Sequence, residues 1–387
     1  MSIPSVGVGV GHADATISIV VSHDPSRDAL RAWDRLVDRT PGTDVTQLTA
    51  WARLRARAGY TRLYLLAFQS GELVGELVGG AQIMYRRVPV LGDVGYLPYG
   101  PVISTAAADR PGICRALCDG LAALGRHRLR MLFVQPPEGA DDLSRELLRR
   151  GFRTSSAGIA PAGSIRIDLT ATEDEIRRRF ARRLRSWPKK WAARGVTVRL
   201  GDSRDIALLA SLMTHSAHYQ NYQPLPLAYL EAMYWELAAT GQAALFVGEV
   251  RGQPVAADLV TGCGVMLRGR LAGFDRTGEA GRLSVPAAVR WEIIRWAKAR
   301  GYRWYDFGGL NEGALQDLLA GQCHHSDSWP SADQAKVAFG GGPYRYPGAV
   351  EMINSVSLRT AYDLSRRWPG GRRMVARATR RLRGAAA

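Results

Sequence analysis

Many features that identify common protein classes are missing from this sequence of 387 residues. No apolar run approaches the roughly 18 residues that suggest a membrane-spanning helix. The four cysteines form no CxxC pair, so the sequence indicates neither a disulfide framework nor a zinc ribbon. The motifs GxSxG, GxxxxGK(S/T) and HExxH are also absent, which argues against several common classes of hydrolase and NTPase.

Two short runs imitate functional motifs but lack the right context. The run VGVGVGH, within the first 16 residues, is rich in glycine, yet no strand pattern precedes it and no helix pattern follows. These residues also lack the basic start and the long apolar core of a signal peptide, so we predict a disordered leader at 1–16 and a cytoplasmic protein. Cys323, His324 and His325 are adjacent and cannot all reach one ion without strain, so a polar loop and no metal site are expected there.

Acidic residues are scarce relative to basic ones: 35 Asp and Glu stand against 52 Lys and Arg, a formal net charge of +17. Two segments carry the whole excess. Residues 176–194 hold nine basic residues and no acidic one, and residues 359–383 hold nine arginines and one aspartate. Such patches attract polyanions, either nucleic acid or an anionic membrane surface, although a solvated charged face explains a single run equally well.

The hydrophobic pattern predicts an α/β protein with two similar halves. In 17–170 we expect a strand, two helices, a hairpin, a helix, a short strand ending near Gln135, another helix and a closing strand at 164–170. In 195–358 a second hairpin is followed by a helix that ends at Gly301 and a strand that ends at Phe307. Hairpins and helix–strand units recur at spacings of about 180 and 173 residues, which indicates an internal duplication.

A basic segment, 171–194, joins the two halves. We expect a helix there that kinks or restarts at Pro188. Trp187 and Trp191 lie four residues apart and share a face in a helix; packing into the core is the preferred interpretation, and stacking on a nucleic-acid base is the alternative. Residues 359–387 are expected to form a basic C-terminal helix and tail.

The stretch 282–342 combines features of an active site. A short strand ends in YDFGG, and Lys336 precedes a second glycine cluster. Asp306 lies at a strand end, where binding groups collect in α/β proteins, but a carboxylate that caps nearby N–H groups is at least as good an explanation. Lys336 could present its charge to a phosphate or to a developing oxyanion, or it could be an ordinary exposed helix lysine.

Four local motifs accompany the duplicated pattern: LPYGPV, the link TEDEIRRRF with PKKWAARGV, then WAKARGYRWYDFGG, and KVAFGG. Together they resemble the Fem family of aminoacyl-tRNA-dependent peptidyltransferases, which build the interpeptide bridge of peptidoglycan. The resemblance covers about residues 17–365. It implies two tandem acetyltransferase-like (GNAT-like) domains, an acceptor bound near their junction, and Lys336 at the reaction centre. The family's coiled-coil arm is absent, so the chain is most similar to the shorter, FemX-type members.

The resemblance and the basic segment together yield a set of expected site residues. Those expected to contact substrate are Tyr99, Gln135, His218, Tyr219, Tyr305, Asp306 and Gly308. Those expected to hold the tRNA backbone are Arg177, Arg178, Arg182, Arg185, Lys189 and Lys190.

Departures from the family pattern fall at positions expected to face the acceptor. Ala335 precedes Lys336 where the family has phenylalanine, Gln135 replaces an aspartate, and His218 or Tyr219 takes the place of an arginine. Because His218 follows His215 by three residues, a general base on that helix is also conceivable. The loop 311–334 is long. These changes leave the acceptor open between a peptidoglycan precursor and a small amine-bearing intermediate of antibiotic biosynthesis.

The donor has two alternatives. Ordinary acetyltransferases hold coenzyme A with an R-x-x-G-x-G/A loop, and the corresponding positions read GRLSVPAAV and ADRPGICRA, without the required glycines. We therefore expect aminoacyl-tRNA as a co-substrate and no bound cofactor. The competing hypotheses are an acyl-CoA-dependent N-acyltransferase, and a non-catalytic protein that binds RNA or a membrane. No stable protein partner is implied, and peripheral membrane contact stays open.

Overall fold

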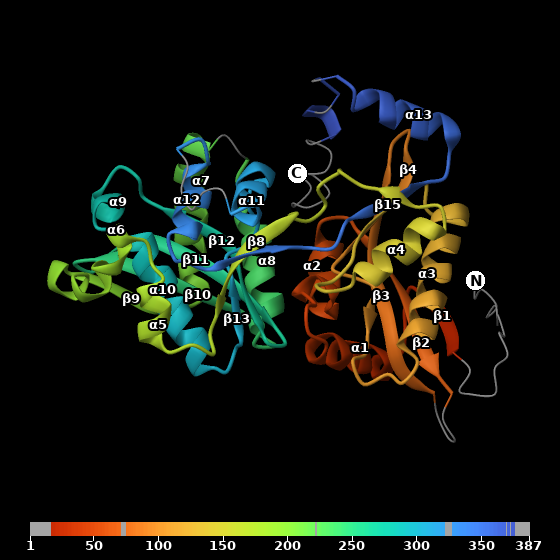
Figure 1. Ribbon diagram of the computed structural model, residues 1–387, viewed down its shortest axis with the longest axis horizontal. Helices are drawn as coiled ribbons and strands as arrows, with labels where there is room; N and C mark the ends of the chain where they lie inside the picture. Colours follow the sequence, from red (N-terminus) through yellow and green to blue (C-terminus); the bar gives the residue numbers. More distant parts are fainter. Residues whose placement is uncertain are drawn as a thin grey trace. The chain divides into compact units, whose positions relative to one another are not determined.

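The computed structural model describes residues 17–70, 75–220, 223–321, 327–368, 370–371 and 373–375, without the side chains of 218–220. The chain divides into two compact units, each with its own mixed sheet (Figure 1). Unit 1 combines the chain up to Ala160 with the chain from Tyr346 onward, and unit 2 is Pro161–Arg345. Among the helices described here, none is long and apolar enough to cross a bilayer.

Unit 1 contains a sheet with the strand order β1-β2-β3-β4-β6-β15-β7, and β5 pairs with β3. Its strands are β1 Ile17–Ser22, β2 Thr61–Gln69, β3 Glu76–Val88, β4 Gly92–Pro98, β5 Val102–Ile103, β6 Met131–Gln135, β7 Arg153–Thr154 and β15 Val350–Ile353. Its helices are α1 Arg27–Arg39, α2 Thr49–Arg57, α3 Arg110–His127, α4 Asp141–Arg149 and α13 Val356–Ser365, with the 3₁₀ turn η1 Val45–Gln47.

The core of unit 1 forms where α3 packs against β1, β2 and β15. Helix α3 begins well because Asp109 caps it through the N–H of Gly112 and a proline follows. Its buried side chains recur at helical spacing, from Ile113 through Leu117 to Leu121 and Leu124, and they join the apolar face of the sheet. The helices and strands expected in this half are therefore confirmed, apart from the closing strand.

Unit 2 contains a sheet with the strand order β14-β8-β13-β12-β11-β10-β9. Its strands are β8 Gly163–Asp168, β9 Val196–Gly201, β10 Ala243–Val250, β11 Gln253–Cys263, β12 Met266–Phe274, β13 Trp304–Asp306 and β14 Gly342–Arg345. Its α-helices are α5 Glu173–Arg178, α6 Arg182–Arg185, α7 Ile206–Gln220, α8 Leu227–Ala238, α9 Glu279–Arg282, α10 Val285–Ala299, α11 Glu312–Leu319 and α12 Ser331–Val337. Its 3₁₀ turns are η2 Trp187–Lys189, η3 Ala192–Arg194 and η4 Ser203–Asp205.

Each sheet is completed by a strand from the other half of the sequence. Strand β8 follows the first half, yet it pairs with β13 and β14 in the sheet of unit 2. Strand β15 comes after the second half, yet it pairs with β6 and β7 in the sheet of unit 1. The structure thus differs from the division expected at 170, 194 and 358: the strand expected to close the first half lies in unit 2. Periodicity identifies a strand but does not identify its partner.

The two sheets share one arrangement, which confirms the internal duplication. In unit 1 the parallel pair β4–β6 ends at Pro98 opposite Gln135, and in unit 2 the parallel pair β12–β13 ends with Arg268 opposite Asp306. The exchanged strand lies antiparallel on the other side of β6 and of β13. Each parallel pair therefore stops at a break in the chain, at Pro136 in one unit and at Gly308 in the other.

Two segments differ locally from expectation. The basic link is not one helix; it consists of α5, α6, η2 and η3, with the break at Pro188 as predicted. Trp191 is buried and its indole N–H donates to Leu283 O at 3.0 Å, so the packing interpretation is confirmed. The expected loop 311–334 contains α11, which begins because Asn311 caps it and which buries Leu315.

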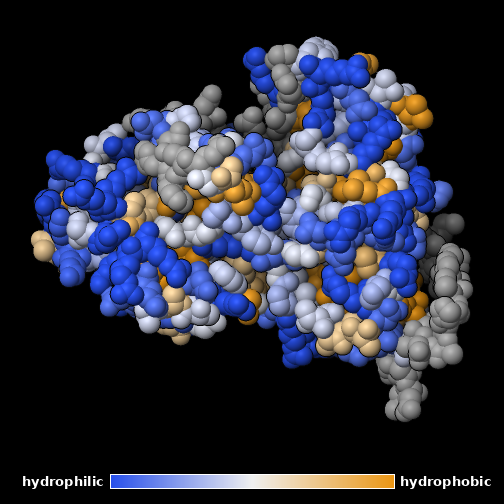
Figure 2. All heavy atoms as spheres, viewed as in Figure 1, coloured by the Kyte–Doolittle hydropathy of each residue, from blue (hydrophilic) through white to orange (hydrophobic). Residues whose placement is uncertain are grey.

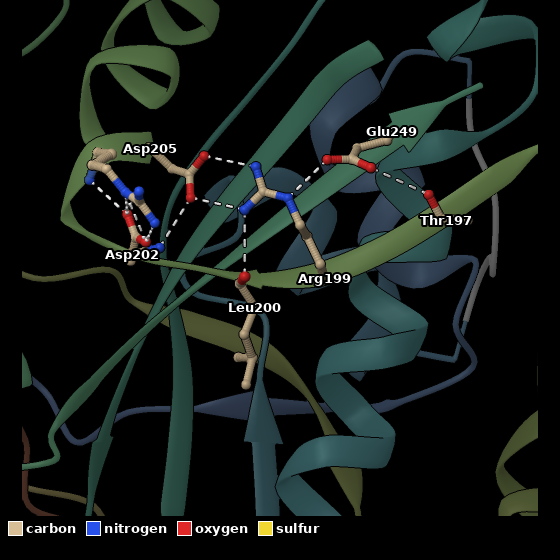
Figure 3. A network of polar contacts seen from close by, with 7 residues as sticks. Thr197, Arg199, Leu200, Asp202, Asp205 and Glu249 are labelled. Carbon is tan, nitrogen blue, oxygen red and sulfur yellow. Dashed lines mark hydrogen bonds and ion pairs between the residues drawn. The ribbon is translucent and has the colours of Figure 1, made fainter. Parts of the chain in front are cut away.

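A polar network fixes the edge strand β9 in unit 2 (Figure 3). The guanidinium of Arg199 donates to Glu249 on β10 at 2.8 Å and to Asp205 at 2.8 and 2.9 Å. Asp202 and Asp205 form a capping box just before α7. The network therefore ties the edge strand both to its neighbour and to the start of α7.

Helix α13 is held against unit 1 by a fully buried carboxylate. Glu351 on β15 accepts hydrogen bonds from Arg359 at 2.8 Å, Tyr362 at 3.2 Å and Ser155 at 2.6 Å. Arg359 also pairs with Asp363, which is 37% exposed. A buried acid with several donors is costly to replace, whereas its exposed counterpart contributes little.

We expect Glu351→Ala to destabilise unit 1 by about 3 kcal/mol, because it leaves Arg359 and Tyr362 without their buried acceptor. Amide hydrogen exchange of α13, followed by mass spectrometry, should speed up. Asp363→Ala is the matched control, since it removes the other acid that pairs with Arg359; it should cost less than about 1 kcal/mol. Equal effects of the two variants would contradict this account of α13.

Candidate active site

The candidate site lies where β13 ends beside β12. After Asp306 the chain turns through Gly308 and Gly309, with φ angles of 70° and 28°. A Cβ atom on Gly308 would lie 2.5 Å from the carbonyl oxygen of Gly269 on β12, so the two backbones touch and only glycine fits. Strand β12 is also irregular there, with a register shift opposite Leu259. The parallel pair therefore ends in a tight glycine break.

Lys336, on α12, reaches this glycine break. Its ammonium donates to Gly308 O at 2.7 Å and to Gly309 O, and lies 3.7 Å from the carboxylate of Asp333. The side chain is only 17% exposed. The structure thus brings together Lys336 and Gly308, two residues that the sequence analysis assigned to the site. The alternative of an ordinary exposed helix lysine is wrong.

The environment of Lys336 lowers the pKa of its ammonium below the usual value. Burial is the main cause, and the positive charge of Arg290 acts in the same direction. The carboxylates of Asp333 and Asp306 oppose the shift. A lysine whose pKa is lowered by burial is a stronger hydrogen-bond donor to an anion than a solvated lysine, and it gives up its proton more readily.

Asp306 is fully buried, and its carboxylate holds the glycine break in place by hydrogen bonding. Its carboxylate accepts from Ser164 Oγ at 2.5 Å, from Arg166 Nε at 3.1 Å and from the N–H of Gly308 at 2.7 Å, and Arg268 Nε lies 3.7 Å away. The capping explanation of Asp306 is therefore confirmed. Its contact with a substrate stays a prediction, as does that of Gly308.

A second buried acid in unit 2 was missed by the sequence analysis. Asp258 on β11 is 6% exposed, and its carboxylate lies 3.6 Å from Arg290 Nε. Burial raises its pKa to about 6 despite Arg290. Tyr305 is fully buried as well, and burial together with the charge of Asp258 raises the pKa of its hydroxyl. The sequence signal that could have revealed Asp258 is an acidic residue inside the apolar strand sequence VAADLVTG.

In unit 1, Tyr99 and Gln135 lie together. Tyr99 is buried, has a positive φ of 54° and packs edge-to-face on Tyr346 at 5.6 Å. The carbonyl of Gln135 accepts from Gly100 N at 3.0 Å, and its side-chain amide donates to Pro347 O at 2.7 Å. The structure thus places both residues at the end of the parallel pair β4–β6.

Two sets of expected residues cannot be compared with the structure. The side chains of His218 and Tyr219 lie outside the described residues, and so do Cys323, His324 and His325. In the part of the chain that is described, no group of His, Cys, Asp and Glu is suited to hold a metal ion.

The basic residues expected to hold tRNA are brought together on α5, α6 and η2 of unit 2. Figure 2 shows a largely hydrophilic surface where Figure 1 labels α6. Arg177 pairs with Asp174 at 2.6 Å and Arg185 donates to Phe180 O at 3.2 Å. Those that are exposed are Arg178, Arg182, Arg185, Lys189 and Lys190.

Comparison with known proteins agrees with this geometry. Residues 148–315 match the acetyltransferase (GNAT) domain model. The chain is 26% identical over 240 residues to a lipid II:glycine glycyltransferase of Staphylococcus saprophyticus subsp. saprophyticus, over 59% of this chain and 56% of that protein. It therefore spans about half the length of the curated relatives it matches.

Solved structures share the whole architecture. FemX superposes with a TM-score of 0.72 at 18% identity, over 89% of this chain and 99% of the other. A tandem GNAT protein from the clavulanic acid biosynthesis pathway superposes with a TM-score of 0.52 at 12% identity, over 88% and 99%. The chain is thus a tandem GNAT-fold protein. The chain is therefore similar in sequence to lipid II:glycine glycyltransferases and similar in fold to FemX, the proteins to which the sequence motifs pointed.

Asp258 predicts a specific dependence of stability on pH. Its folded pKa of about 6 exceeds the ordinary value of 3.8, so the folded state binds more protons than the unfolded state between these values. The free energy of unfolding should therefore fall as pH rises through this window, by on the order of 2–3 kcal/mol, and Asp258→Asn should remove this fall.

Thermal unfolding of the Asp258→Asn variant and the unchanged protein between pH 4.5 and 7.5 measures this dependence. Asp275→Asn is the control, because Thr277 lowers the pKa of Asp275 and its effect should be lost only at lower pH. A difference between Asp258→Asn and the unchanged protein that does not vary with pH would refute the buried, protonation-prone state of Asp258.

Proposed function

We propose that this protein transfers an aminoacyl group from aminoacyl-tRNA to an amine on a peptidoglycan precursor. The observation that carries the proposal is the Lys336 ammonium, buried at the glycine break where the parallel strands of a GNAT unit end. Fold and relatives support it, since the relatives are named as lipid II:glycine glycyltransferases. The proposal assumes a reaction in the cytoplasm, where aminoacyl-tRNA is made.

The reaction needs little covalent help from the protein. The acceptor nitrogen attacks the ester carbonyl, an amide C–N bond forms, and the C–O bond to the ribose breaks. The amine loses one proton and the ribose oxygen gains one, so atoms and charge balance. Because the ester is already activated, orientation and stabilisation of the oxyanion supply most of the acceleration. In the proposal Lys336 donates to the tetrahedral oxyanion or to the leaving ribose oxygen.

The donor side favours tRNA over coenzyme A. Ser284, the N-cap residue just before α10, has a φ of 54°, and the start of this helix lacks the glycines that would let a pyrophosphate approach the backbone. The surface of α5, α6 and η2 instead offers several exposed cations. Within the described residues no carboxylate pairs with Arg182, Lys189 or Lys190, which leaves these charges for phosphates.

The acceptor has a second candidate, a small amine-bearing metabolite. The departure at Gln135 is the reason for keeping it: the family has an aspartate at this position, whereas the buried amide of Gln135 donates to Pro347 O. A lipid-linked precursor would in addition require contact with a membrane surface.

Incubation with radiolabelled aminoacyl-tRNAs and candidate acceptors tests the proposal. We expect label in an amide-linked product, and ribonuclease should abolish it because the donor is destroyed. Lys336→Ala should lower the rate at least about 100-fold. Lys298→Ala is the matched control, since Lys298 also donates to two backbone carbonyls, Leu169 O and Ala171 O, and should keep near-normal rates.

Transfer that persists after ribonuclease treatment, or with acyl-CoA in place of aminoacyl-tRNA, would show an acyl-CoA enzyme instead. Binding of tRNA without turnover for any acceptor, unaffected by Lys336→Ala, would favour the non-catalytic alternative.

The basic surface makes a separate prediction about affinity. The triple variant Arg182→Ala, Lys189→Ala and Lys190→Ala should raise the KM for aminoacyl-tRNA about tenfold or more while kcat changes little. The dependence of log affinity on log salt should become shallower by about two to three.

An equal loss of charge on α1, by Arg27→Ala, Arg35→Ala and Arg39→Ala, serves as the control because these arginines are exposed in unit 1. Both binding constants are measured by filter binding across a salt series. The same weakening in both triple variants would show that net charge, and not this surface, governs binding.

A further inference from the structure

Helix α13 is fixed to unit 1 by apolar packing and by one buried charge. Tyr362 is buried and Leu358 packs against the same core cluster. Arg359, only 16% exposed, donates to the buried Glu351 at 2.8 Å and also pairs with Asp363, which is 37% exposed. A helix on a water-exposed surface normally buries its apolar stripe and exposes its charges. In α13 a buried arginine lies on the inner face, while large apolar side chains remain on the outer face.

The outer face of α13 is apolar and nearly uncharged. Val356 is 84% exposed and Leu364 is 49% exposed, and Trp368 just beyond the helix is 60% exposed. The hydroxyls on this face have partners within the helix: Thr360 Oγ1 donates to Val356 O at 3.0 Å, and Ser357 shares a hydrogen bond with Ser355. Figure 2 shows a few hydrophobic groups among mostly hydrophilic atoms in the region that Figure 1 labels α13. This face can therefore leave water at little cost in lost hydrogen bonds.

Arginines adjoin the apolar face at the end of the helix. Arg367 and Arg373 are exposed, and Met374 between these charges and the chain end is 62% exposed. Residues 359–383 hold nine arginines and one aspartate. An anionic phospholipid bilayer has an apolar interior beneath a layer of negatively charged headgroups. A short apolar face with cations at its border is complementary to such a surface.

We propose that α13, with Arg367, Trp368, Arg373 and Met374 beyond it, docks unit 1 onto an anionic phospholipid surface. Val356, Leu364 and Trp368 enter the interface between headgroups and acyl chains, and Arg367 and Arg373 contact the phosphates. Glu351 holds the helix so that this face points outward. This surface belongs to unit 1 and shares no residue with the candidate active site of unit 2, and the proposal stands whether or not the transfer reaction does.

Sedimentation of the full chain with vesicles tests the proposal. The unchanged protein should bind vesicles of phosphatidylglycerol and phosphatidylcholine at least tenfold more tightly than vesicles of phosphatidylcholine alone. The double variant Leu364→Ser and Trp368→Ser should bind the mixed vesicles at least tenfold more weakly. The double variant Leu200→Ser and Trp235→Ser is the matched control, since it removes an exposed leucine and an exposed tryptophan from unit 2; it should bind within twofold of the unchanged protein.

Further measurements test the role of the arginines and distinguish a membrane from other binding partners of this face. Arg367→Glu with Arg373→Glu should weaken binding to the mixed vesicles and leave the weak binding to phosphatidylcholine unchanged. The Leu364/Trp368 variant should keep its circular dichroism, its affinity for tRNA and its molar mass in solution.

Three results would overturn the proposal. The first is vesicle binding that the Leu364/Trp368 variant retains. The second is a loss of tRNA binding in that variant, which would make the face an RNA surface. The third is a dimer of the unchanged protein that the variant dissociates, which would make the face an interface between two copies of the chain.

Discussion

The contact of the Lys336 ammonium with the carbonyls of Gly308 and Gly309 is the interaction on which the candidate site depends. It requires three separate parts of unit 2 to meet. Strand β13 must stop beside β12, the break must consist of glycines so that Gly308 can touch Gly269, and α12 must return the lysine to the break. The buried Asp306 supports the break from the other side through the Gly308 N–H. A cation held this way needs little rearrangement when negative charge develops next to it, and that is the condition for electrostatic catalysis.

The exchange of β8 and β15 makes each unit depend on both halves of the duplicated sequence. Neither half of the sequence supplies its own last strand: β8 covers β13 in unit 2, and β15 covers β6 in unit 1. Because β8 carries Ser164 and Arg166, the strand that the first half donates also provides two of the donors around Asp306. The site in unit 2 is thus built partly from the end of the first half.

Much of this could be predicted from the sequence, because hairpins, helix caps and glycine breaks are local signals. The helix ending at Gly301 and the strand before Gly308 follow from such signals, whereas the choice of Lys336 over an ordinary helix lysine rested on the family resemblance. Strand exchange could not be predicted, since a strand's pattern does not show its partner. Asp258 belongs to no motif: it is a single acid within an apolar strand, and its burial reveals it. Helix α11 could not be predicted because its apolar residues span only about a turn and a half and lie within a polar segment. The inward-facing Arg359 of α13 depends on Glu351, which lies on another element and gives no local signal in the sequence.

The state of Lys336 is the central claim, and the chain offers a clean way to measure it, because it has only four lysines: Lys189, Lys190, Lys298 and Lys336. A pH titration of the isotope-labelled lysine Cε and Nζ resonances by NMR, assigned with Lys→Arg variants, follows each ammonium separately. The account predicts that Lys336 titrates below its usual value of 10.5 and that its resonance moves when a stable amide analogue of the aminoacyl-tRNA 3′ end is added, but not with the deacylated end. A Lys336 that titrates at 10.5 or above and ignores the analogue would contradict the account.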